Sequence, residues 1–488
     1  MSTLWSVPAC GLATFICLRL LGVRWNIAAG VALLGFAFAP LPATGAGLGV
    51  LLAARRRGRE LAPRDWMARA WLGRRPALVS ADGLAIGCDA RRALVRIPLR
   101  SRSGAHTLIV GATGSGKTVT EAWIVARAID HGHGAVIVDP KGDALLRSQA
   151  AGAALRAGRQ FIEWTPDGPA VYNPYAHGSA SEIADKAIAG EPYSEPHYQR
   201  QAQRYLAHAV RALHGAGETV TPRRLLELMD PRELELAARA SADEGHARAL
   251  FGYLDSLDAR QRSGLAGTRD RLAILAESEL GRWLDPRRGN GPPLDLLAAI
   301  RARAVVYFRL EADRLPLLAR MLAAAIVADL LTVAASAQRS PVPTLVAIDE
   351  FSAISAAGVA RLFGRARAAG FSLLLATQEL ADLRSASDEL LDQVLGNVEC
   401  VIAHRQSAPD SAELVARIAG TQEVWAKTEQ LSHSLATGRA TRTLGREYVI
   451  HPDRVKALRP GTAAVNVVSA GRCTVARIFH PYEMEAGR

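Results

Sequence analysis

Eight consecutive residues have the types and spacing of a loop that binds the phosphates of a nucleotide. Backbone N–H groups can point at a phosphate only where no Cβ stands in the way, which requires glycines at set places. Within such a loop, Lys117 would reach the β- and γ-phosphates of ATP, and the Thr118 hydroxyl would bind Mg²⁺. The eight residues are Gly111, Ala112, Thr113, Gly114, Ser115, Gly116, Lys117 and Thr118.

Lysine is rare in this chain, which sharpens the interpretation of Lys117. The sequence holds five lysines against fifty-four arginines. A lysine kept at this position indicates that the flat, forked guanidinium does not fit there. A chance match in a glycine-rich linker would lack a strand before the loop and a helix after it, and the sequence predicts both.

A pair of carboxylates follows an apolar run farther along the chain. The run at 344–348 predicts a buried strand that delivers Asp349 and Glu350 to the edge of a sheet. There Asp349 can hold the Mg²⁺ shell, and Glu350 can orient or deprotonate an attacking water. Paired acids after a strand are often solvated turn residues, but the glycine loop upstream favours the catalytic interpretation.

Two further kinds of side chain are candidates for contact with the γ-phosphate. Gln378 ends the next predicted strand and would lie beside that phosphate as a polar sensor. Arg361, Arg365 and Arg367 precede the same strand. In a ring, one of them could enter the neighbouring subunit's site as an arginine finger. Surface arginines are common in this protein, so a solvated face is an equally good interpretation of any one of them.

The elements that must position these residues alternate between strands and helices. A buried strand is predicted at 106–110, a helix from Thr118 to about Ile129, and a second strand at 135–138. This alternation predicts an α/β fold with a mainly parallel sheet, a RecA-like P-loop domain assembled from residues 59–180 and 286–488. Further strands are expected at 81–98 (two), 304–310, 345–348, 372–376, 400–404, 463–469 and 473–479, with a polar stretch at 432–446.

Between these two parts the pattern changes to one of helices alone. Apolar residues recur at helical spacing, as in Tyr205, Ala209 and Leu213, and convincing strands are missing. Residues 181–285 are therefore predicted to form an all-α insertion domain. Its charge is nearly balanced, so nothing marks it as a basic cradle for DNA.

The first 58 residues predict a transmembrane anchor. Leu4–Leu18 is apolar, and Ile27–Ala54 is long enough to cross a hydrocarbon core of ~30 Å. Arginines follow at once from Arg55, which places the rest of the chain in the cytoplasm. We expect a hairpin of two spans; a single span at Ile27–Ala54 is the alternative, and a signal peptide is disfavoured. The apolar stretch at 315–337 contains two charges and predicts a core helix.

The net charge of +12 is concentrated beside this anchor. Residues 1–105 hold fifteen arginines against four acidic residues, so they carry +11 and the remainder is close to neutral. Anionic lipid and the positive-inside bias explain this excess as well as nucleic acid does, so charge alone gives no argument for DNA binding. The five cysteines form no CxxC pair, which predicts neither a disulfide framework nor a zinc site.

The order of the motifs resembles that of the type IV secretion coupling proteins, the conjugative branch of the FtsK/HerA-like ring ATPases. The resemblance covers roughly residues 80–480, and DPKGD with ATQELADL is more specific than the glycine loop. The motifs are the glycine loop, VDPKGD at 138–143, VYNPYA at 171–176, AIDEFSAI at 347–354, RARAAGF at 365–371, LATQELADL at 375–383 and Gly396-Asn397.

The resemblance implies a homohexameric, Mg²⁺-dependent ATPase at the bacterial inner membrane. It implies recruitment of a relaxase-bound single strand of DNA for the subunits of a type IV secretion channel, with the all-α domain facing this substrate. It also implies that Arg367, placed just before Ala-Gly-Phe, is the better candidate for the finger acting in trans. Asp139, Lys141 and Asp143 match a motif close to the nucleotide, without a definite chemical role. The short loop between the spans and the missing acidic tail depart from many relatives.

Three other functions compete with DNA export. The chain could be a coupling ATPase that delivers effector proteins. It could also be a chromosomal FtsK/HerA-like translocase, for which a dedicated DNA-reading C-terminal domain is expected and not found in the sequence. A membrane receptor that uses ATP only for assembly is the third, and the full set Lys117, Thr118, Asp349 and Glu350 argues against it.

Overall fold

The computed structural model describes residues 79–481 apart from short gaps, and these belong to one compact unit, Pro76–Tyr482. The predicted membrane anchor, residues 1–58, lies outside the described residues. The gaps fall at 81–82, 101–102, 191–192, 194, 355, 387 and 433–434.

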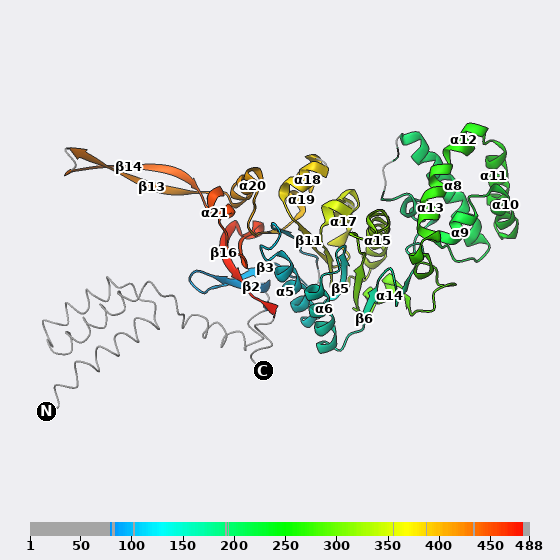
Figure 1. Cartoon of the computed structure of the whole chain (residues 1–488), viewed down its shortest axis with the longest axis horizontal. Helices are drawn as coiled ribbons and strands as arrows, with labels where there is room; N and C mark the ends of the chain where they lie inside the picture. Colours follow the sequence, from blue (N-terminus) through cyan, green and yellow to red (C-terminus); the bar gives the residue numbers. More distant parts are fainter. Residues whose placement is uncertain are drawn as a thin grey trace, which may run out of the picture. The chain divides into compact units, whose positions relative to one another are not determined.

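A mixed sheet of 12 strands forms the centre of the described chain (Figure 1). Its parallel part runs in the order β12-β4-β11-β10-β5-β9-β6. All residues of β4, β5, β10, β11 and β12 are buried. Strands covered on both faces are continuous apolar runs, which is why the sequence predicted them to within two residues. The bounds are Thr107–Val110 (β4), Gly134–Asp139 (β5), Phe161–Trp164 (β6), Val305–Arg309 (β9), Thr344–Ile348 (β10), Phe371–Thr377 (β11) and Cys400–Ala403 (β12).

The remaining strands of this sheet are antiparallel, so the sheet is less uniformly parallel than the alternation of elements predicted. β15 pairs with β12, β16 with β15, and β2 with β16, which joins strands from opposite ends of the described chain. The two leading strands and the closing hairpin predicted from the sequence are confirmed. Their bounds are Val79–Ser80 (β1), Gly83–Asp89 (β2), Leu94–Ile97 (β3), Thr462–Val467 (β15) and Arg472–Ile478 (β16).

Helices cover both faces of the parallel part. The chain moves from β4 to β5 and from β9 to β10 in opposite directions along the sheet, so right-handed crossovers put α5 and α15 on opposite faces. α15, Pro316–Ala337, is the one helix of the described residues long and apolar enough to span a membrane, and 72% of its most apolar window is buried. It is the core helix that the sequence predicted. The other helices here are Lys117–Asp130 (α5), Ala144–Arg156 (α6), Leu296–Arg301 (α14), Phe351–Ile354 (α16), Ala356–Ala366 (α17), Leu380–Ala386 (α18), Asp388–Asn397 (α19), Pro409–Ala419 (α20) and Pro452–Lys456 (α21).

Helices alone occupy the described residues from Ala180 to Trp283, as predicted from the spacing of apolar residues (Figure 1). They enclose an apolar cluster of their own, which includes Tyr205, Leu225 and Leu272. Before and after them, β7 (Val171–Tyr172) and β8 (Pro293–Leu294) pair with each other, so both ends of the segment return to one place. The helices are Ala180–Ala187 (α7), Pro196–Gly215 (α8), Pro222–Glu227 (α9), Pro231–Ala240 (α10), Glu244–Asp255 (α11), Ala259–Gly264 (α12), Ala266–Glu277 (α13) and the 3-10 helix Glu279–Trp283 (η2).

A long hairpin was not anticipated. β13 (Thr421–Ser432) and β14 (Leu435–Tyr448) pair antiparallel in a sheet of two strands, with Thr421 opposite Tyr448. Most of the polar stretch at 432–446, to which the sequence assigned no element, is strand β14. Its residues are Thr-, Gly- and Arg-rich, so they offer no apolar alternation that would indicate a half-buried strand.

Candidate active site

The glycine loop follows β4, and hydrogen bonds from its backbone N–H groups hold it in place. Gly111 N–H donates to the Gln378 carbonyl at 3.1 Å, and Ala112 N–H donates to the Arg405 carbonyl at 3.0 Å. Gly114 and Gly116 have φ of +74° and +108°, a conformation that side chains rarely adopt. The ends of β11 and β12 therefore fasten the loop, and its glycines are required by the backbone.

The loop and the helix behind it fit a phosphate. Gly116 is the N-cap of α5, and no side chain caps the N-terminus of this helix. Its first N–H groups remain available to an anion, and the helix dipole favours negative charge there. A Cβ placed at Gly114 would meet nothing within 4 Å, so the loop is open at that point. The buried Ser115 hydroxyl has no hydrogen-bond partner.

Lys117 binds both carboxylates that follow β10. Its Nζ is ion-paired with Asp349 and lies 3.2 Å from Glu350 Oε1. β10 is hydrogen-bonded to β5 on one side and to β11 on the other, so its end lies in the middle of the parallel strands. Glu350 has a φ of +46°, which is uncommon for a residue with a side chain and is the kind of strain found at active sites.

Burial and charge set the protonation of these groups. Burial opposes the charged form of Lys117, but Asp349, Glu121 and Glu350 outweigh it and raise the pKa of the lysine. Burial also acts on Glu350, yet Lys117, Lys141 and a hydrogen bond from Gln378 lower the pKa of this carboxyl. In Asp349 burial wins, and the pKa is raised. Glu350 is therefore the carboxylate whose environment keeps it ionised.

Gln378 and Lys141 reach the same oxygen of Glu350. Gln378 Nε2 donates to Glu350 Oε1 at 3.1 Å, and Lys141 Nζ donates to it at 3.2 Å. Together with Lys117, three donors converge on one carboxylate oxygen. The sequence had placed Gln378 here, whereas it assigned no chemical role to Lys141. The scarcity of lysine, used above for Lys117, was a signal for Lys141 as well.

Glu121 is a residue that the sequence analysis missed. It stands one helical turn after Lys117 on α5, is completely buried, and neither of its carboxyl oxygens has a hydrogen-bond partner. Burial, followed by the charge of Asp349, raises its pKa well above the ordinary value. Burial therefore favours the neutral form of this carboxyl group. Its signal in the sequence was an acidic residue directly before the apolar run 122–126.

Arg367 is not brought to this site. Its Nη2 donates to the Asn397 carbonyl at 2.8 Å and lies 3.6 Å from Glu399 Oε1. Arg367 precedes β11 and Glu399 precedes β12, so both lie where these strands begin. The glycine loop follows the end of β4, which is parallel to them, at the opposite edge of the sheet. Arg361 and Arg365 are on α17, and Thr118 is in the first turn of α5.

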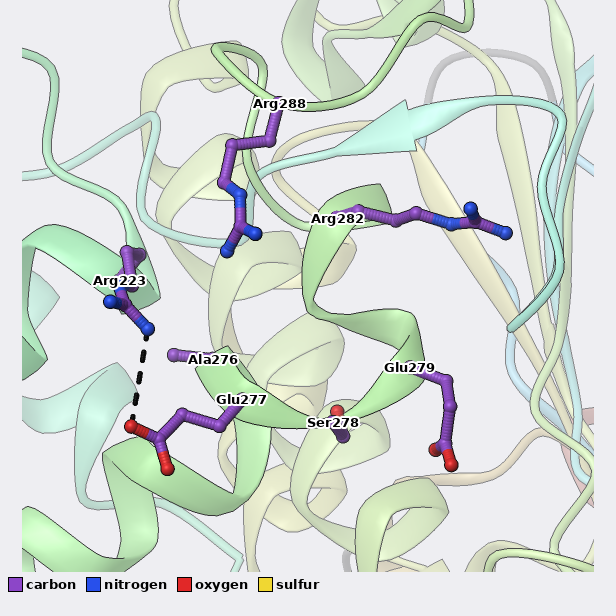
Figure 2. A pocket seen from close by; sticks show the side chains of 7 residues that line it. All are labelled: Arg223, Ala276, Glu277, Ser278, Glu279, Arg282 and Arg288. Carbon is purple, nitrogen blue, oxygen red and sulfur yellow. Dashed lines mark ion pairs between the residues drawn. The ribbon is translucent and has the colours of Figure 1, made fainter.

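A separate cavity of about 490 Å³ is lined by residues of the 180–283 helices and by Arg288, which follows them (Figure 2). Arg223 there faces Glu277, with a 3.9 Å ion pair, and Figure 2 shows Arg282 directed away from them. The wall carries both signs of charge. The lining residues are Arg223, Ala276, Glu277, Ser278, Glu279, Arg282 and Arg288.

Two family models match two separate parts of the chain. Residues 89–280 match the central domain of the helicase HerA. Residues 343–460 match the TraM recognition site of TraD and TraG. The first range contains the glycine loop, and the second contains Asp349, Glu350 and Gln378. A search of the curated proteins gives no match.

Solved structures share the fold at low sequence identity. The bacterial conjugative coupling protein TrwB (TrwBdeltaN70, unbound) is 16% identical, with 83% of this chain and 91% of that chain covered and a TM-score of 0.63. TrwB with ADP and Mg²⁺ is 18% identical, with 77% and 85% covered and a TM-score of 0.58. VirB4 of Thermoanaerobacter pseudethanolicus is 15% identical, with 83% and 99% covered and a TM-score of 0.52.

Proposed function

We propose that this chain is a type IV secretion coupling ATPase; the match to the TraM recognition site of TraD and TraG, the match to the HerA central domain and the fold shared with TrwB support the proposal. In this proposal it forms a homohexameric ring at the bacterial inner membrane. The ring hydrolyses ATP, recruits relaxase-bound single-stranded DNA and moves it to the secretion channel.

The observation that carries the proposal is the convergence of Lys117, Asp349, Glu350 and Gln378 behind an open glycine loop. Lys117 would exchange its carboxylate partners for the β- and γ-phosphates of ATP. Glu350, kept ionised, would accept a proton from the attacking water, and Gln378 would help to orient that water. Thr118 and Asp349 would hold Mg²⁺, which neutralises charge on the phosphate oxygens.

A ring accounts for the position of Arg367. This side chain lies at the edge of the sheet opposite its own glycine loop, and in this proposal it would serve a neighbouring subunit's site. In the assembly, residues 59–180 and 286–488 would form the ATPase domain, and the all-α domain 181–285 would face the substrate. Residues 1–58 would cross the membrane twice and leave the ATPase domain in the cytoplasm.

Two related functions use the same site. The match to the HerA central domain favours a chromosomal DNA translocase as the second candidate. Delivery of effector proteins is the other, and the site does not separate it from DNA export because both need the same hydrolysis. The cargo therefore has to be tested directly.

ATP hydrolysis by the full-length chain, with and without single-stranded DNA, tests the motor. We expect DNA to stimulate hydrolysis, and Lys117→Ala to lower kcat by roughly 100-fold or more, because a charge that stabilises the transition state is lost. Lys456→Met is the matched control, since this lysine pairs on the surface with Asp453. Absence of stimulation at every protein concentration would contradict the DNA motor.

A mating assay tests the same proposal in the cell. Glu350→Gln keeps the size of the side chain and its contact with Gln378 but removes the base. We expect plasmid transfer to be lost with this variant and retained with Lys456→Met. Unimpaired transfer with Glu350→Gln would sink the proposed role in DNA export.

A further inference from the structure

We propose that Lys141 is a positioning residue that holds the Glu350 carboxylate beside Gln378 after Lys117 has turned to the phosphates. This role rests on the proposed ATP hydrolysis and adds to it a residue for which the motif resemblance gave no chemical function. It is carried by the loop that presents Lys141, by the contacts of Glu350 and by the second task of Lys117.

The loop after β5 presents Lys141 from a rigid backbone. The Asp139 carboxylate accepts the backbone N–H groups of Lys141, Gly142 and Asp143 at 2.8, 2.7 and 2.6 Å. It also accepts the hydroxyl of Tyr307. Gly142 has a φ of +78°, so this turn is built for a glycine. With its backbone held at both ends of the turn, Lys141 can aim its side chain at one place.

Glu350 depends on its donors for its orientation. Its side chain is 11% exposed, so water replaces little of what the protein supplies. Three donors share Oε1, at 3.2 Å (Lys117), 3.2 Å (Lys141) and 3.1 Å (Gln378). Hydrogen bonds from a charged donor are roughly twice as strong as neutral ones. The two lysines are therefore the stronger of the three restraints.

Lys117 cannot remain on Glu350 throughout the reaction. It already divides its charge between Asp349 and Glu350, and a bound triphosphate would attract it more strongly than either. Gln378 would then be the one remaining partner of Glu350 among these donors if Lys141 were removed. A base held by one neutral hydrogen bond samples more orientations, and misplacement by about 1 Å can lower a rate roughly 100-fold.

The alternative is an ordinary surface ion pair. The Lys141 side chain is 47% exposed, and pairs of this kind contribute little to stability. The two interpretations differ in what is lost on substitution. A surface pair predicts unchanged kcat, whereas a positioning residue predicts a lower kcat with an unchanged affinity for nucleotide.

Steady-state hydrolysis by the full-length chain separates them. We expect Lys141→Met to lower kcat by roughly 10- to 100-fold. KM and the dissociation constant of a fluorescent ATP analogue should stay within about 3-fold of the wild-type values. A residue that only positions the base does not change the binding of nucleotide in the ground state. Lys141→Arg should restore part of kcat, since it keeps the charge at similar reach, and Lys456→Met should match the wild type. Unchanged or increased kcat in Lys141→Met, or an equal loss of affinity, would overturn the proposal.

Zero-length cross-linking with a carbodiimide tests the contact between Lys141 and Glu350 independently of enzymatic activity. In the nucleotide-free full-length chain we expect a cross-linked peptide that joins Lys141 to Glu350, absent in Lys141→Arg because a guanidinium does not couple. The product should persist with a non-hydrolysable ATP analogue, and its disappearance there would overturn the positioning role. A wild-type chain without ATP hydrolysis overturns the proposed function itself. A hydrolysing wild type matched by Lys141→Met overturns the role of Lys141 alone.

Discussion

The most demanding test of the fold concerns a buried ion pair that joins the 180–283 helices to the core. Lys186 Nζ in α7 lies 2.6 Å from Asp329 Oδ1 in α15, and the side chains are 1% and 0% exposed. The ammonium also donates to the His177 carbonyl at 2.6 Å, and the Tyr172 hydroxyl donates to Asp329 Oδ2 at 2.9 Å. Lys186→Met removes the cation and leaves the carboxylate with Tyr172.

Breaking one partner of a buried pair is strongly destabilising, because the other charge stays uncompensated. The expected loss is ~3–5 kcal/mol. The unfolding entropy is about 2.1 cal/mol/K per residue, which for a unit of roughly 400 residues corresponds to about 1.2 °C per kcal/mol, so the melting temperature should fall by roughly 4–6 °C. Burial already raises the pKa of Asp329 against the pull of Lys186 and Tyr172. An acid with a raised folded-state pKa favours folding at low pH, so the fall should be larger at pH 8 than at pH 5.

Thermal unfolding of the full-length chain measures this effect. The double variant Lys186→Met/Asp329→Asn should recover more than half of the loss, since the amide carries no charge and still accepts from Tyr172. Lys456→Met, in an exposed pair, should leave the melting temperature unchanged. If Lys186→Met melts with the wild type at both pH values, or if Asp329→Asn rescues nothing, the reasoning from burial is refuted.

Three other predictions concern the buried carboxyl of Glu121, the close backbone approach at Gly104 and the proposed ring. Because the pKa of Glu121 is raised, the wild type should lose stability as pH rises above about 4.5, and Glu121→Gln should lack this loss. Identical urea unfolding profiles of the wild type at pH 5 and pH 8 would contradict this prediction. A Cβ at Gly104 would collide with the carbonyl oxygen of Phe371, so Gly104→Ala should lower the free energy of unfolding by about 1–3 kcal/mol, and a neutral change would disprove the close approach. Arg367→Ala and Glu350→Gln chains should each be inactive and should regain ATP hydrolysis when mixed, whereas inactive mixtures would exclude a finger acting in trans.

The amino-acid sequence predicted most of the parallel sheet because strands buried on both faces consist of continuous apolar runs. β4, β5, β10 and β11 are buried along their whole length, and this burial is the reason for the apolar runs from which they were predicted. The glycine loop was equally readable, since left-handed backbone at Gly114 and Gly116 excludes other residues. The helices of the 180–283 segment followed from their apolar spacing.

The β13–β14 hairpin could not be read in the same way. Its strands pair with each other alone within the described residues, so no buried face imposes an apolar alternation. The large apolar residues Trp425 and Leu444 lie opposite each other and are 65% and 48% exposed. Pairing of this kind depends on the register between two strands, which is a property of neither strand alone.

What the sequence determined by itself was the inventory of the site: a phosphate loop after one strand, a lysine that begins the following helix, and two acids and a glutamine that each follow a strand. The tertiary structure decided which of these groups share an atom. Lys141 meets Glu350 across 209 residues, and Lys186 meets Asp329 across 143. Both contacts depend on the order of elements in space: β10 lies beside β5 although residues 140–343 separate them, and α7 meets α15 although most of the 180–283 helices lie between them in the chain. That order is set by the packing of whole elements, so local sequence carries no record of it.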